Sequence, residues 1–210
     1  MKPACTYCGS VIICLLLLVT GCNNQPTTPV LPANNVPGVY NTSTVNPDID
    51  KSPLDLSYYP VDYPQLKMTG RTNQPLIARV VYSRPSVDGR KIYGDLLQFG
   101  KPWRLGANEA TEIEFFQPVI IQNKTLEAGR YVLYAKPYRD HWTIIFNTDL
   151  YTWGLKIDST KDIFQADIPV TKLSRSVPVF TMQFADTAEG GALLMGWDSV
   201  HASLPFTFSK

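Results

Sequence analysis

The main body of this sequence lacks cysteine, which excludes an internal disulfide there. All four cysteines lie within the first 22 residues, at positions 5, 8, 14 and 22. Cys5 and Cys8 have the CxxC spacing of redox and zinc sites, but no second pair or neighbouring histidine follows them. We therefore expect hydrophobic packing to hold the folded part together.

An excess of charge of one sign is also missing. The chain has 19 Lys and Arg against 18 Asp and Glu, a formal net charge of +1. Proteins that bind nucleic acid usually show a strong basic excess or a basic stripe. The balance therefore predicts no nucleic-acid partner.

Motifs that commit a chain to a chemistry are lacking as well. The sequence has no G-x-S-x-G nucleophile motif, no phosphate-binding loop and no dinucleotide fingerprint. The two histidines, His141 and His201, are expected at a hairpin turn and on the solvent face of a strand. We expect exposed polar residues there rather than metal ligands, and we expect no cofactor. Catalysis stays open, and the balance is against it.

The sequence does contain an export signal. An apolar run from Val11 to Val19 is of signal-peptide length and too short to span a bilayer comfortably. It ends in Val-Thr-Gly-Cys at 19–22, which resembles the lipobox of bacterial lipoproteins. The resemblance implies removal of residues 1–21 and acylation of Cys22, with chains such as palmitate that hold the protein on a membrane. Asn23 is not the Asp that retains lipoproteins in the inner membrane, so we expect the outer membrane and its periplasmic face.

A tether follows the modified cysteine. Residues 22–51 are rich in Pro, Asn and Thr, with prolines at 26, 29, 32 and 37 and no hydrophobic period. Such a segment buries too little apolar surface to offset its ordering entropy. We expect it to be disordered and to separate a folded domain, residues 52–210, from the membrane.

The amino-acid sequence of the folded domain is typical of strands and turns. Aromatic residues make up 11% of the chain, and short alternating runs are separated by Gly, Pro, Asn and Asp. The nine strands expected are Leu76–Ser83, Thr111–Phe116, Val119–Ile121, Arg130–Ala135, Trp142–Asn147, Phe164–Val170, Val179–Phe184, Leu193–Trp197 and Val200–Phe206. The pattern predicts a single all-β domain, a β-sandwich or jelly-roll-like fold, with an irregular or helical insertion at 150–162.

Three separate blocks carry a family resemblance. Residues 82–85 (Tyr-Ser-Arg-Pro), 89–94 and 103–111 resemble, in order and spacing, the bacterial family called domain of unknown function 2911. The likeness continues through 128–131 and 142–147 and covers about residue 52 to the end. It implies a β-sandwich domain of secreted or membrane-anchored proteins, often from the Bacteroidetes lineage. It implies no activity, cofactor or partner.

The block 103–111 is the strongest candidate for a site. Ligand-binding candidates in and near it are Arg84, Arg90, Trp103, Arg104, Asn108, Glu109 and Thr111. Trp103 would stack on a sugar or carboxylate ligand, and Arg104 would hold it with a bidentate fork. In the alternative, which we favour, Arg84 or Arg104 pairs with Glu109 to lock a loop, and Gly106 and Asn108 supply turn geometry.

Two functions from different classes follow. The first is a non-catalytic envelope binding or interaction module that recognises a glycan or another envelope component. The second is a hydrolase acting on envelope or imported carbohydrate, with Glu109 as a weak candidate for the acid or base. Glu112 and Glu114 alternate with apolar residues, so we expect them on the solvated face of a strand.

Replacing Cys22 tests the anchor. In Cys22→Ser no thiol is available for acylation, so the full-length precursor should accumulate uncleaved. Mass spectrometry of the intact protein measures this. Normal maturation of the variant would overturn the lipoprotein assignment.

Overall fold

The computed structural model describes residues 50–208. The predicted signal, Cys22 and nearly all of the predicted tether lie outside the described residues. Within 50–208, no helix combines the length and the apolar character that a membrane crossing needs.

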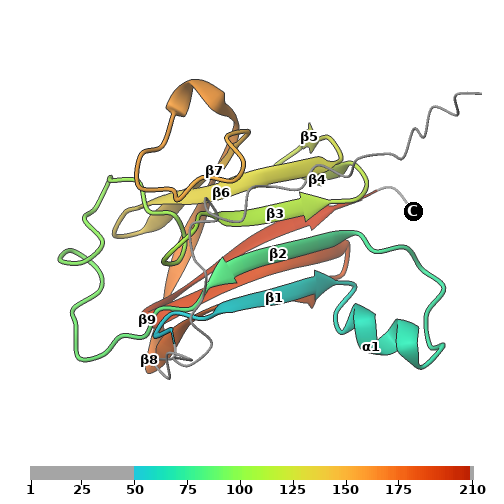
Figure 1. Ribbon diagram of the computed structural model, residues 1–210, viewed down its shortest axis with the longest axis horizontal. Coiled ribbons are helices and arrows are strands. Elements are labelled where there is room, and N and C mark those ends of the chain that lie inside the picture. Colours follow the sequence, from blue (N-terminus) through green and yellow to red (C-terminus); the bar gives the residue numbers. More distant parts are fainter. Residues whose placement is uncertain (1–49, 209–210) are drawn as a thin grey trace, which may run out of the picture. The chain divides into compact units, whose positions relative to one another are not determined.

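Strands dominate the described residues (Figure 1). They are β1 (Leu54–Tyr59), β2 (Ala78–Ser83), β3 (Thr111–Phe115), β4 (Val119–Ile121), β5 (Lys124–Leu126), β6 (Gly129–Pro137), β7 (His141–Asn147), β8 (Asp162–Asp186) and β9 (Gly190–Thr207). One short α-helix, α1 (Tyr63–Met68), and one 3-10 turn, η1 (Ser159–Lys161), accompany them.

The nine strands form one antiparallel sheet in the order β1-β2-β3-β6-β7-β8-β9-β4-β5. β8 pairs with β7 over its first residues and with β9 from Val170 onward, so the long strands carry the sheet from one layer to the other. A hydrogen bond between the two layers confirms that they face each other: the Tyr82 hydroxyl in β2 donates to the Met182 carbonyl in β8 at 3.0 Å. Figure 1 shows β1 and β2 beside β8 and β9. The all-β, sandwich-like fold is therefore confirmed.

The long strands differ from the predicted ones. The two strands predicted at 164–170 and 179–184 are one strand, β8, and the two predicted at 193–197 and 200–206 are one strand, β9. The turn-like residues between the members of each pair form irregularities that do not end the strand. The β8–β9 register shifts between Lys172 and Val177, and Asp198 takes a left-handed φ of 50° within β9. An extra residue of this kind bends a strand without ending it.

Three elements were not predicted: β1, β5 and α1. β1 is an edge strand with a mixed exposure pattern, so it lacks clean alternation. The β4–β5 hairpin turns at Gln122-Asn123, whose φ angles of 49° and 63° suit a tight hairpin although the pair is not the usual Asn-Gly. The predicted insertion at 150–162 is confirmed as irregular chain that ends in η1.

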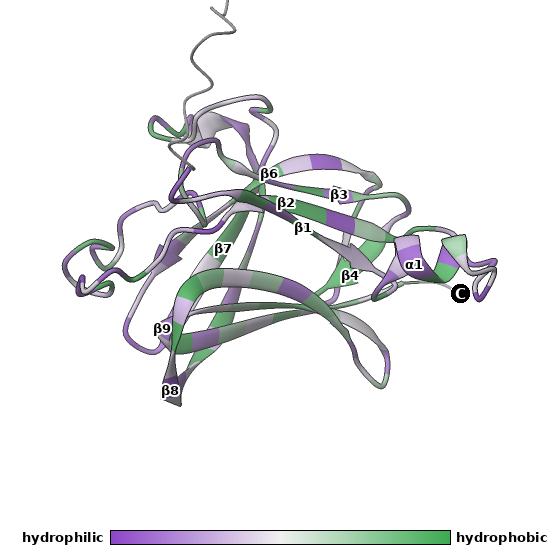
Figure 2. Cartoon of the chain, turned by 60° about the horizontal axis from the view of Figure 1, so that its bottom comes forward, coloured by the Kyte–Doolittle hydropathy of each residue, from purple (hydrophilic) through white to green (hydrophobic). Residues whose placement is uncertain are grey.

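The core contains two aromatic clusters. In the first, the indole of Trp103 contacts the rings of Trp142, Phe180 and Trp197, with centroids 5.0 to 5.7 Å apart. In the second, Phe206 is central, and its ring contacts those of Tyr59, Phe115, Phe184 and Phe208. Figure 2 shows hydrophobic segments, in green, along the strands. Since these rings come from most of the strands, aromatic packing joins the two layers.

A pair of tryptophans tests this packing. Trp103→Ala should lower the free energy of unfolding by about 3–5 kcal/mol, because the buried indole leaves a cavity that its neighbours cannot fill. Trp153→Ala is the matched control: its side chain is 53% exposed, and the loss should stay below about 1 kcal/mol. Chemical denaturation of both variants measures this, and equal losses would contradict the assignment of Trp103 to the core.

Candidate ligand-binding site

The block 103–111 runs from the core to the start of β3. Trp103 is only 7% exposed, and its indole nitrogen donates to the Gly106 carbonyl at 3.3 Å. Its faces are therefore occupied by protein rings rather than open to a ligand. Thr111 is fully buried, and its hydroxyl donates to the Leu105 carbonyl at 2.6 Å. Both side chains therefore fix the backbone conformation of the block 103–111.

The turn geometry expected of Gly106 and Asn108 is present. A Cβ on Gly106 would lie 2.9 Å from the Ser83 carbonyl oxygen, so only glycine fits between the block and β2. Asn108 has a left-handed φ of 56°, and its side-chain amide donates to Asp50 at 2.7 Å and to the Ser52 carbonyl at 3.2 Å. Asn108 thereby ties the block to the chain that leads into β1.

The predicted ion pair between Glu109 and either Arg84 or Arg104 is wrong. Arg84 lies 3.2 Å from Asp55 and also contacts the Phe180 carbonyl. Arg104 donates to the Trp153 carbonyl at 3.0 Å. In the described part of the chain, neither arginine pairs with Glu109. The reason is β1, which the sequence did not reveal: its register puts Asp55 opposite Tyr82, two residues from Arg84.

The remaining candidates divide between two hollows. Arg90, Trp103 and Arg104 line one of about 470 Å³, which we call the basic hollow. Glu109 lines another of about 390 Å³, which we call the sheet-face hollow. The loop 148–158 borders both, because Trp153 lines the sheet-face hollow and Gly154 and Leu155 line the basic hollow. The structure thus brings together only part of the predicted set.

The floor of the sheet-face hollow is a row of alternating charges across β2, β3 and β6. Arg79 pairs with Glu114 at 2.5 Å, and Arg130 lies 3.7 Å from Glu114 and 3.8 Å from Glu112. These side chains are 21–33% exposed. Glu112 and Glu114 therefore lie on the outer face of their strand, as predicted, and cross-strand pairing fixes them there.

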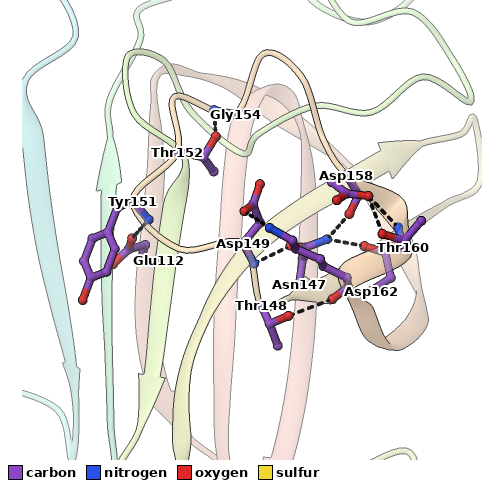
Figure 3. Close-up of polar contacts among 11 residues, drawn as sticks. Glu112, Asn147, Thr148, Asp149, Tyr151, Thr152, Gly154, Asp158, Thr160 and Asp162 are labelled. Carbon is purple, nitrogen blue, oxygen red and sulfur yellow. Dashed lines mark hydrogen bonds and ion pairs between the residues drawn. The ribbon is translucent and has the colours of Figure 1, made fainter.

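Two exposed aromatic side chains rise beside this floor. Tyr151 is 82% and Trp153 is 53% exposed. Their loop is fixed to the sheet through its backbone, since the Tyr151 amide donates to Glu112 at 3.2 Å and the Ala110 amide donates to the Thr152 carbonyl at 3.1 Å. Figure 3 shows Tyr151 beside Glu112. The aromatic rings are thus held at the hollow rather than packed into the core.

A polar clamp holds the base of the loop (Figure 3). The buried Asn147 amide donates to the Asp158 carbonyl at 2.8 Å and to the Asp162 carboxylate at 2.7 Å, and its oxygen accepts from the Asp149 amide at 2.7 Å. Lys161 pairs with Asp149 at 2.5 Å. The two ends of the loop are therefore joined through one side chain.

Neighbouring groups strengthen the clamp. The Tyr134 hydroxyl donates to Asp162 at 2.8 Å, and burial together with this carboxylate raises the pKa of Tyr134 above its ordinary value. The Thr160 hydroxyl and amide donate to Asp158 and lower the pKa of that carboxyl. These hydrogen bonds favour the ionised form of Asp158.

The histidines lie apart from both hollows. His141 stacks on Tyr138 with ring centroids 4.5 Å apart and contacts Asp140 at 2.8 Å. His201 lies in β9, where it pairs with Thr171 of β8. In residues 50–208 no group of three His, Cys, Asp or Glu side chains is arranged to hold a metal ion.

The sequence pattern did not identify Arg79, Arg130, Tyr151 and Trp153 as site residues. The first two are single arginines in alternating strands, and only the strand order brings them together around Glu114. A weak signal existed for the other two, because Tyr151 and Trp153 are large aromatic residues in a segment that shows no strand or helix period.

Asn147 provides the test of the clamp. Asn147→Ala should lower the free energy of unfolding by about 2–4 kcal/mol, because three hydrogen bonds are lost and the partner groups stay partly buried. Chymotrypsin should then cut faster at the exposed aromatics of the loop. The control is Asn73→Ala, which replaces an exposed asparagine. Unchanged cleavage in Asn147→Ala would show that the loop is held by other contacts.

Comparison with protein-family models matches residues 64–206 to the family described as "Protein of unknown function (DUF2911)". Searches of the curated proteins and of the solved structures find no match. The matched range contains all residues that line the basic hollow and all that line the sheet-face hollow except Leu54. The chain therefore belongs to the DUF2911 family, as its three sequence blocks predicted.

Proposed function

We propose that this protein is a lipid-anchored envelope protein that binds a glycan, without catalysis, in the sheet-face hollow. One observation carries the proposal: Tyr151 and Trp153 are held exposed beside a row of paired arginines and glutamates. Exposed aromatic side chains of this size are costly in water, and a ligand that covers them removes the cost.

The lining suits a sugar. Aromatic rings pack against the apolar faces of pyranose rings, while guanidinium and carboxylate groups exchange hydrogen bonds with hydroxyls. Arg79, Arg130 and Glu109 lie in the same hollow as the two aromatics. The volume of about 390 Å³ falls in the range of small-ligand sites, which is about 300–1,000 Å³.

The loop supports binding because it is organised before the ligand arrives. Its two ends meet at Asn147, and its centre bonds to Glu112, Ala110 and Arg104. Less conformational freedom is then lost when a ligand binds.

The carboxylates favour binding over hydrolysis. Glycoside cleavage needs two carboxyl groups that face the bond from opposite sides. Glu112 and Glu114 lie side by side on one strand, and both contact arginines. Their oxygens are held by neighbouring cations instead of facing each other across a cleft.

Glu109 supports the second candidate, a hydrolase acting on envelope or imported carbohydrate. It is exposed, it lines the sheet-face hollow, and it has no ion-pair partner within the described range. A free carboxylate beside a sugar has the chemistry of a general acid or base. The glycan-binding module is favoured over this hydrolase only because, among the described residues, no second carboxyl group faces Glu109 across the hollow.

The proposed location rests on the N-terminal signal. The lipobox-like sequence before Cys22 supports a lipid anchor, and Asn23 supports the outer membrane facing the periplasm. The proline-rich stretch after it supports a spacer between the membrane and the binding domain.

A glycan-binding assay on the full-length protein in detergent micelles tests the function. A neutral oligosaccharide that binds the wild type should bind Trp153→Ala at least about tenfold more weakly, as expected when a central aromatic contact is lost. Tyr138→Ala removes an exposed aromatic that lies outside the sheet-face hollow and should leave binding unchanged. Equal binding by Trp153→Ala and the wild type would refute the site.

Glu109→Gln separates the two candidates. A binding module should keep its affinity within about threefold and release no product. If the wild type cleaves the glycan and Glu109→Gln does not, the hydrolase is correct. Product analysis by mass spectrometry, together with calorimetric titration, gives both readouts.

A further inference from the structure

The basic hollow differs from the sheet-face hollow in charge. Arg90, Lys101 and Arg104 line the basic hollow, and no acidic side chain lines it. The sheet-face hollow has two arginines and three glutamates. The first therefore has a positive potential, whereas the charges of the second nearly cancel.

The cations of the basic hollow keep unused donors. Arg104 uses one nitrogen on the Trp153 carbonyl. Arg90 contacts the backbone carbonyls of Ser86 and Val87 and closes its own turn. The Lys101 side chain is exposed, and its ammonium group has no hydrogen-bond partner among residues 50–208. Each guanidinium has five N–H groups and the ammonium has three, so donors remain for a ligand.

A buried indole nitrogen gives an independent sign of a missing acceptor. Trp197 is 1% exposed and lines the basic hollow, and its indole nitrogen has no hydrogen-bond partner in the described part of the chain. The neighbouring Trp103 also lines the hollow, but its indole nitrogen is paired with the Gly106 carbonyl. Buried donors normally find an acceptor. An oxygen atom of a ligand would supply the one that Trp197 lacks.

The walls reduce contact with water. Trp103, Trp197 and Leu97 are buried side chains that line the hollow beside the cations. Burial lowers the pKa of the Arg104 guanidinium from its ordinary value. Arginine nonetheless stays charged in proteins, and its attraction to an anion strengthens as water is excluded.

We propose that the basic hollow is a second ligand site, which binds a small organic anion of monosaccharide size through its phosphate or carboxylate oxygens. Its volume of about 470 Å³ accommodates such a molecule. The proposal goes beyond glycan binding in the sheet-face hollow and does not depend on it. The two sites lie on either side of the loop 148–158.

Calorimetric titration of the full-length protein in detergent micelles tests the ligand class. The probes are glucose 6-phosphate, galacturonate and glucose, which share a sugar body and differ in charge. We expect at least one of the two anions to bind and glucose to bind at least about tenfold more weakly, because charge-assisted hydrogen bonds carry the affinity. The preferred anion identifies the group. Affinity should fall as salt concentration rises.

Matched substitutions locate the site. Lys101→Gln and Arg104→Gln should each weaken binding of the anion by about tenfold. Lys156→Gln and Arg175→Gln replace exposed cations that line neither hollow, and they should bind as the wild type does. Lys101→Gln is the cleaner variant, because Arg104 also holds the loop.

The four tryptophans give a readout that needs no substitution. All four lie in the described residues, as Trp103, Trp142, Trp153 and Trp197, so an ¹⁵N-labelled protein shows four indole N–H signals. The anion should shift the Trp197 signal as its N–H gains an acceptor and leave the Trp153 signal in place. A neutral glycan in the sheet-face hollow should do the reverse, so the two proposals can fail separately.

Three outcomes would overturn the basic site. They are glucose binding as tightly as both anions, no anion binding up to about 10 mM, and anion binding that Lys101→Gln and Arg104→Gln leave unchanged. A shift of the Trp153 signal without one of Trp197 would place the anion in the other hollow and would equally refute the proposal.

Discussion

The contact between the block 103–111 and the loop 148–158 determines both candidate sites. Two hydrogen bonds make it, from the Arg104 guanidinium to the Trp153 carbonyl and from the Ala110 amide to the Thr152 carbonyl. The packing is tight, since a Cβ on Gly154 would lie 3.0 Å from side-chain atoms of Arg104 and Ala110. Because residues of the loop line each hollow, the shape of both candidate sites depends on this contact.

The contact rests on the layers beneath it. Trp103 fixes the start of the block in an aromatic cluster that joins the two layers, and Gly106 lets the block approach β2 closely. Asn147 fixes the other partner by joining the ends of the loop. The charged side chains on the outer face of β2, β3 and β6 pair with one another across the strands, and surface pairs of this kind contribute little to stability.

The sequence predicted the features that depend on neighbours along the chain. Alternation identified β2, β3, β6 and β7 to within a few residues, and it put Glu112 and Glu114 on the outer face. It did not predict features that depend on distant partners. Arg84 meets Asp55 only because the edge strand β1 pairs with β2, and Trp103 is buried by rings from β7, β8 and β9. Trp153 gains its place at the hollow from a hydrogen bond to Arg104, 49 residues away.

Hydrogen exchange of the Ala110 amide tests the central contact most directly. This amide precedes β3 and donates to the Thr152 carbonyl across the chain. If the block and the loop form one rigid unit, Ala110 exchanges as slowly as the amides of β3. Exchange as fast as that of an exposed loop amide would contradict the account, because the wall between the two hollows would then open continually.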